Sequence, residues 1–178
     1  MSADRQNPLI ILEDGEKDLV SFLAKGRFDR ARNRNATYRK MGDSNDKYSH
    51  DRIGLFAELA FAKKTDVYPS QILSPKCNSK TFGSDLGDTV FKGKRFDVKA
   101  TVHNNGVLWI DKVNENIDYY AFFVVRENEK VECELVGVIE AGVLHSKKPS
   151  HRKQFKFPCI WAEQGELTDW SEFDAQIN

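Results

Sequence analysis

The run from Tyr119 to Val125 constrains the fold more than any other part of this 178-residue chain. All of its residues are apolar or aromatic, so no alternation separates a buried face from a solvated one. A strand that is buried on both faces has this pattern, whereas a strand at the surface alternates apolar and polar residues. We therefore expect a central strand whose sheet is covered on both sides.

The flanking segments predict the rest of the domain. Residues 51–63 read as a buried helix because apolar side chains cover most of its surface at helical spacing. Glu58 is the one carboxylate within that apolar surface, and it needs solvent or a partner. A short helix is expected at residues 140–145. Further strand-like segments lie at residues 66–72, 88–92, 95–102, 107–110 and 131–139. We predict an α/β or α+β fold, with a central mixed β-sheet flanked by helices.

The first 49 residues differ in character from the remainder, and we divide the chain into an N-terminal helical and basic extension (1–49) and a main domain (50–178). Lys plus Arg and Asp plus Glu number 27 each, so overall charge gives no signal for nucleic acid. The extension nevertheless carries alternating cations at Arg30, Arg32 and Arg34. Segregated charge can present a cationic groove to a polyanion, although a solvated arm explains it equally well.

The cysteines and the hydropathy pattern predict the compartment. The three cysteines are scattered and odd in number, which argues against a disulfide framework and suits a reducing environment. No apolar run approaches about 18 residues, the length of a membrane-spanning helix. We expect an intracellular, cytoplasmic protein with no membrane partner.

Residues 88–102 predict a β-hairpin that turns at Gly93. A two-residue loop that ends at Gly93 places Asp88 opposite Asp97, whereas one that begins there places Asp88 opposite Lys99. Because strand side chains alternate, Asp97 and Lys99 share a face, and Asp88 joins that face in either register.

This face has the chemistry of a hard-metal site. Like charges directly opposed across two strands repel, and a divalent cation between Asp88 and Asp97 would remove the repulsion. Carboxylate oxygens favour Mg²⁺ or Mn²⁺. Glu58 could add a further carboxylate, and Lys99 could position water or neutralise developing charge. These groups are suited to phosphodiester hydrolysis.

The arrangement resembles the PD-(D/E)XK nuclease superfamily. The resemblance rests on Glu58 in its apolar helix, Asp88, and the Asp-x-Lys motif of Asp97, Val98 and Lys99. It implies a restriction-endonuclease-like core and a Mg²⁺-dependent nuclease that hydrolyses DNA, as either an endonuclease or an exonuclease. It makes Asp88, Asp97 and the main-chain carbonyl of Val98 metal ligands. Glu58 would bind the metal directly or through water, and Lys99 would orient the nucleophilic water.

Three points stay open at this stage. Asp85 competes with Asp88 for the role of first aspartate, although Asp85 lies outside the hairpin register. The alternatives to a nuclease are a catalytically silent nucleic-acid-binding module with the same fold and a protein-interaction domain. The resemblance also allows a homodimer.

DNA contacts are expected from the cations at the hairpin tip and in the extension: Lys92, Lys94, Arg95, Arg30, Arg32 and Arg34.

Overall fold

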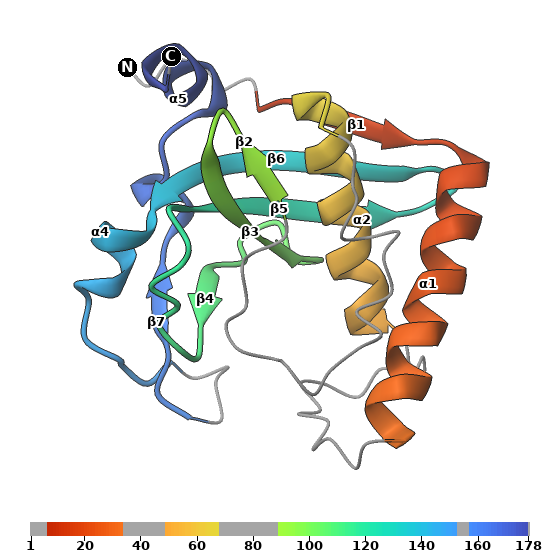
Figure 1. Ribbon diagram of the computed structural model, residues 1–178, viewed down its shortest axis with the longest axis horizontal. Coiled ribbons are helices and arrows are strands. Elements are labelled where there is room, and N and C mark those ends of the chain that lie inside the picture. The colour runs from red at the N-terminus through yellow and green to blue at the C-terminus, as the bar shows by residue number, and fades with distance from the viewer. Residues whose placement is uncertain (1–6, 34–48, 68–88, 153–156, 178) are drawn as a thin grey trace.

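The computed structural model describes residues 7–33, 49–67, 89–152 and 157–177 (Figure 1). A curled mixed sheet forms its centre, with five strands in the order β1-β6-β5-β3-β2 among the described residues. Neighbouring strands are antiparallel except β3 and β5, which are parallel. The strands are β1 (Leu9–Leu12), β2 (Thr89–Phe91), β3 (Lys94–Thr101), β5 (Tyr119–Glu127) and β6 (Val131–Glu140). The predicted mixed sheet flanked by helices is confirmed.

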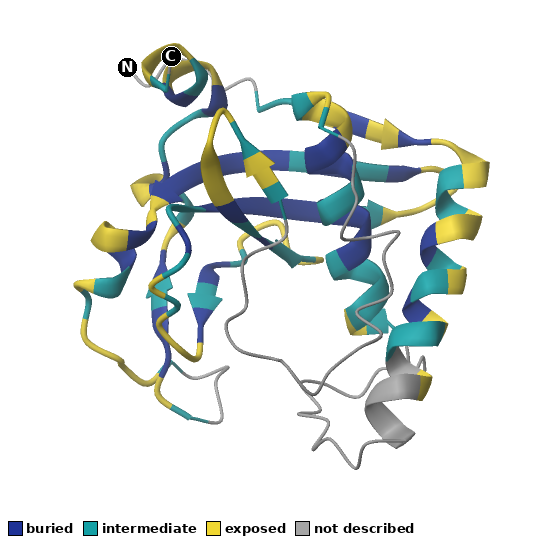
Figure 2. Ribbon diagram, viewed as in Figure 1, coloured by how far each residue is buried: buried dark blue, intermediate teal, exposed yellow. Residues whose placement is uncertain are grey.

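The central position of β5 follows from its sequence. Residues 120–125 are all buried, and the strand pairs with β3 on one side and β6 on the other. Strands β5 and β6 are dark blue along most of their length (Figure 2). Phe123 and Val125 pack on one side of the sheet, and Phe122 and Val124 pack on the other. A continuous apolar run is what such two-sided burial requires.

Two helices cover one face of the sheet. Helix α2 (Ser49–Thr65) packs Phe56 and Phe61 against β3 and β5, and α1 (Asp14–Asn33) packs beside α2. Strand β1 pairs with β6, and Ile10 belongs to the same core cluster as Val20 of α1. Residues 7–33, which fall in the predicted N-terminal extension, thus contribute a strand and a helix to the common sheet and core.

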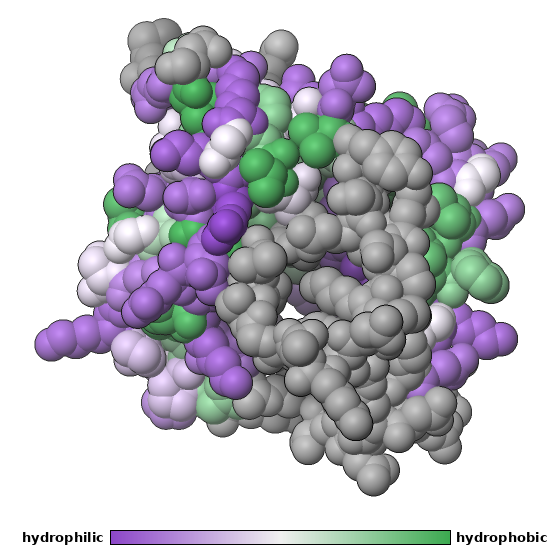
Figure 3. Space-filling model, viewed as in Figure 1, coloured by the Kyte–Doolittle hydropathy of each residue, from purple (hydrophilic) through white to green (hydrophobic). Residues whose placement is uncertain are grey.

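The opposite face is covered by a second, two-stranded sheet. Strands β4 (Leu108–Ile110) and β7 (Ile160–Ala162) pair antiparallel, and Leu108 and Ile110 pack on Phe122 of the main sheet. Three shorter helical segments complete the described chain: α4 (Ala141–His145), the 3-10 turn η1 (Gln164–Glu166) and α5 (Trp170–Gln176). The visible surface of the described residues is largely hydrophilic, with apolar side chains in small groups (Figure 3).

Most of the predicted elements lie within two residues of their expected bounds, and one prediction differs. A strand was expected at residues 66–72, but helix α2 runs to Thr65 and residues 66 and 67 follow it outside any strand. The rest of that prediction lies outside the described residues. No helix of the described chain is both long and apolar enough to cross a membrane.

Candidate functional site

The hairpin closes in the first of the two predicted registers. Thr89 pairs with Phe96 and Phe91 with Lys94, which leaves Lys92 and Gly93 as the loop. Both loop residues have positive φ, 47° and 76°, as a type I′ turn demands. Asp88 and Asp85 lie outside the described residues.

Asp97 and Lys99 share one face of β3, as predicted. Phe96 and Val98 are buried in the core cluster that includes α2, so Asp97 and Lys99, which alternate with them along the strand, face the other side of the sheet. The Lys99 Nζ lies 2.8 Å from Oδ1 and 2.7 Å from Oδ2 of Asp97. The Asp97 side chain is 14% exposed and that of Lys99 is 35% exposed. The carboxylate is therefore sheltered, whereas the ammonium reaches solvent.

The two residues lie in the wall of a cavity of about 470 Å³. The parallel ladder sets Tyr120 of β5 beside Asp97 and Phe122 beside Lys99, so both aromatic rings share the face of the ion pair. Strand β4 and the segment that follows it supply most of the remaining wall of the cavity. The lining residues are Asp97, Lys99, Ala100, Val107, Trp109, Ile110, Asp111, Lys112, Val113, Asn114, Tyr120 and Phe122. An apolar surface thus adjoins a charged one in the same cavity.

Tyr120 connects the cavity to a histidine. Its hydroxyl lies 3.0 Å from the Nε2 atom of His145, and the two rings meet edge to face. Burial lowers the pKa of His145 below its usual value, and the charge of Glu115 opposes that shift. A neutral imidazole that carries its proton on Nδ1 accepts a hydrogen bond from the Tyr120 hydroxyl at Nε2. The pair holds the Tyr120 ring in position behind the Asp97 site.

The Glu58 carboxylate is bound by Arg27, a residue that no sequence pattern singles out. Its Oε1 accepts a hydrogen bond of 3.0 Å from Nη1 of Arg27, and its Oε2 accepts one of 2.9 Å from Nη2. The Glu58 side chain is 10% exposed, so Arg27 on α1 supplies the partner that a sheltered carboxylate needs. Glu58 makes no hydrogen bond or ion pair to Asp97 or Lys99. The structure thus holds Glu58 in one ion pair, and Asp97 with Lys99 in another.

The predicted ligand set is therefore only partly assembled in the described chain. No group of three or more His, Cys, Asp or Glu side chains among the described residues could hold a metal ion. Val98 pairs with Ala121 in the parallel ladder, and its side chain lies in the core. Asp97 is the described carboxylate of the predicted site that opens into the cavity.

The cations predicted to contact DNA have different surroundings. Lys92 forms an ion pair of 3.0 Å with Asp174 and lies over the Phe91 ring. Lys94 and Arg95 are exposed, and the backbone N–H of Arg95 donates to the carboxylate of Asp118.

The other three predicted DNA-contacting residues are arginines of the N-terminal extension. Arg30 and Arg32 fall within α1, but their side chains are not described. Arg34 lies outside the described residues.

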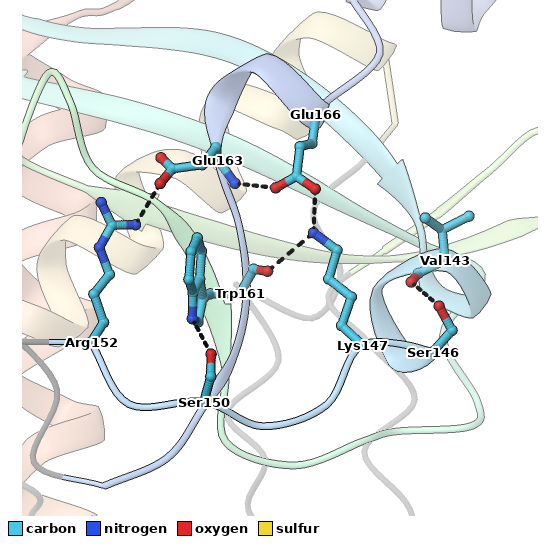
Figure 4. A network of polar contacts seen from close by, with 8 residues as sticks. All are labelled: Val143, Ser146, Lys147, Ser150, Arg152, Trp161, Glu163 and Glu166. Atoms are coloured by element: carbon cyan, nitrogen blue, oxygen red, sulfur yellow. Dashed lines mark hydrogen bonds and ion pairs between the residues drawn. The ribbon is translucent and has the colours of Figure 1, made fainter.

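A polar network fixes the second sheet to the chain that follows α4 (Figure 4). Lys147 donates to Glu166 at 2.5 Å and to the carbonyl of Trp161 at 3.3 Å. The hydrogen bond from Lys147 holds the pKa of Glu166 below its usual value. Arg152 stacks on the Trp161 ring at 4.8 Å and pairs with Glu163. These contacts hold β7 and its partner β4, and thereby the outer wall of the cavity.

The comparisons with known proteins identify no relative. No family model, no curated protein and no solved structure matches the chain.

Proposed function

We propose that the chain is a Mg²⁺-dependent nuclease that hydrolyses DNA phosphodiester bonds, with a restriction-endonuclease-like core of the PD-(D/E)XK type. The observation that carries the proposal is the Asp97–Lys99 pair, which shares one strand face and opens into the cavity. A carboxylate and an ammonium side by side are the groups that metal-assisted phosphoryl chemistry uses. Mn²⁺ would serve in place of Mg²⁺.

Each residue of the pair has a distinct role in this proposal. Asp97 supplies oxygen ligands, and a carboxylate that already accepts from Lys99 keeps further lone pairs for a cation. Asp88 remains the second ligand predicted from the sequence, with the Val98 carbonyl as a third. Bound Mg²⁺ would lower the pKa of its water and stabilise the leaving oxygen. Lys99 orients the nucleophilic water and offsets negative charge on the reacting phosphate.

A cleavage assay with matched variants tests the proposal. Plasmid, linear, single-stranded and branched DNA are each incubated with the protein without added metal, with Mg²⁺, Mn²⁺ or Ca²⁺, and with EDTA. We expect Mg²⁺-dependent cleavage by the parent protein, and a loss of about a hundredfold or more in Asp97→Asn and Lys99→Met. The control substitutions Asp66→Asn and Lys130→Met, at exposed positions away from the cavity, should leave the rate unchanged. Full activity in both site variants would refute the assignment.

One contact favours a second candidate, a catalytically silent nucleic-acid-binding module. Arg27 occupies both oxygens of Glu58, so one of the predicted carboxylates is neutralised by a basic side chain. We do not include Glu58 among the proposed metal ligands for this reason. The silent module predicts salt-dependent DNA binding that no divalent metal converts into cleavage on any of the substrates above.

A further inference from the structure

We propose that the cavity beside Asp97 and Lys99 holds a single unstacked nucleotide, so that the substrate is a single strand or an unpaired stretch of DNA and not a continuous duplex. This inference rests on the proposed nuclease function and adds its substrate class. It is carried by the composition, size and charge of the cavity.

The cavity has the two surfaces that one nucleotide needs. Val107, Ile110 and Tyr120 contribute an apolar side, and the charged groups of β3 lie next to it. A volume of about 470 Å³ falls within the range of small-molecule pockets, about 300–1,000 Å³. A flat base can lie against the apolar side while its phosphate lies near the charged side. Nucleases that only follow a duplex backbone have no need of such an apolar recess.

The cations of the cavity are placed for the phosphate. Lys99 and Lys112 both line the cavity, and Lys112 is exposed. Within the part of the chain that the structure describes, no ion pair engages Lys112, so its ammonium is available to an anion. A phosphate between these two cations would lie beside Asp97, where the proposed reaction takes place.

A base inside a duplex cannot reach the apolar side, because it is stacked and paired. Extruding it costs free energy of unstacking and unpairing, and the cost is least for a strand that is already unpaired. Stacking and apolar contact with a base favour binding and tolerate any sequence. The cavity therefore selects unpaired nucleotides by the energy of unstacking, without reading the sequence.

Val113 offers a way to fill the cavity without disturbing the core. Its side chain is 48% exposed and lines the cavity, so Val113→Trp should add a bulky ring at the opening. Val143→Trp is the matched control, since Val143 is 52% exposed on α4 and does not line the cavity. Thermal unfolding of both variants verifies that each one folds.

The test measures binding in EDTA, where no cleavage occurs. A fluorescein-labelled oligothymidylate is titrated by anisotropy, and unlabelled hairpin duplex and thymidine monophosphate compete with it. We expect the single strand to bind at least tenfold more tightly than the duplex. Val113→Trp should weaken single-strand binding at least tenfold and leave duplex binding unchanged, whereas Val143→Trp should behave as the parent.

The outcomes separate this inference from the proposed function. Equal affinity for single strand and duplex, or an unaltered Val113→Trp variant, overturns the inference even where Mg²⁺-dependent cleavage is present. Competition by the monophosphate as strong as that by the oligomer also overturns it, because the cavity would then take free nucleotides. A preference for single-stranded DNA without cleavage under any metal condition would refute the proposed nuclease function and would still support the assignment of the cavity to an unpaired nucleotide.

Discussion

The Arg27–Glu58 pair allows the role of Glu58 to be separated into stability and catalysis. Arg27→Met would leave a carboxylate of 10% exposure without its two hydrogen bonds. Breaking a fully buried ion pair costs about 3–5 kcal/mol, whereas exposed pairs contribute about 0–1 kcal/mol. Because the Arg27 side chain is 32% exposed, this pair lies between those limits. We expect Arg27→Met to lower the free energy of unfolding by about 1–3 kcal/mol.

A double-mutant cycle isolates the interaction. Urea denaturation of the parent, Arg27→Met, Glu58→Gln and the double variant should give a coupling energy of about 1–2 kcal/mol. The exposed pair of Lys63 and Glu16 is the control, and its coupling should stay below about 1 kcal/mol and weaken in salt. Additive effects of the two substitutions, within about 0.5 kcal/mol, would show that the bidentate contact does not stabilise the fold.

The same variants test the chemistry. Since Glu58 is held by Arg27 and makes no hydrogen bond with Asp97, Glu58→Gln should slow Mg²⁺-dependent cleavage far less than Asp97→Asn does. The double variant removes both charges and should likewise keep most of the rate of the parent. If Glu58→Gln abolished cleavage while the protein stayed folded, Glu58 would have to leave Arg27 and act at the metal, as the family resemblance implies.

Two further predictions concern stability. Gly137→Ala should cost about 1–3 kcal/mol in urea denaturation, because the new Cβ would lie 2.8 Å from both the Cβ of Leu167 and the carbonyl oxygen of Thr168. Gly54→Ala is its control: its Cβ meets nothing within 4 Å, so it should stabilise the protein by about 0.5–1 kcal/mol, and the reverse ranking would contradict the packing. The pKa of His145 is lowered in the folded state, so the unfolded chain binds the proton more readily. The contribution of His145 to the free energy of unfolding should be complete above the ordinary pKa of about 6.5 and be lost as the pH falls toward the folded pKa. Unfolding free energies measured at several pH values should therefore rise with pH in this range, and His145→Gln should make that rise smaller.

Local pattern was enough to predict the strands but not their partners. The two-sided burial of β5 follows from an apolar run, and the hairpin follows from Gly93 between two short strands. Strand β1 is only four residues long, and its place beside β6 depends on a pairing more than a hundred residues away in sequence. Such a pairing leaves no periodic signal of its own. The division of the chain at residue 50 is drawn from local composition, which carries no information on the pairing of β1 with the main sheet.

In the candidate site, too, local pattern predicts contacts within one strand but not contacts between distant elements. Asp97 and Lys99 lie two residues apart on one strand, so alternation alone places them together. Arg27 and Glu58 meet only because α1 packs beside α2, and nothing in either helix sequence specifies that contact.

The aromatic side of the cavity likewise depends on the fold. Tyr120 reaches the site because β3 and β5 pair in parallel in the register that sets it beside Asp97. A shift of that register by one residue would turn Tyr120 to the other face and place its neighbours there instead. The two-sided burial of β5 resists such a slip only weakly, because apolar residues occupy both of its faces. On β3, by contrast, a shift of one residue would exchange Asp97 for the buried Phe96 and bring a charge into the core, so β3 resists a slip more strongly than β5 does. The residue proposed to bind the metal thus also helps to hold the face of β3 beside which Tyr120 lies.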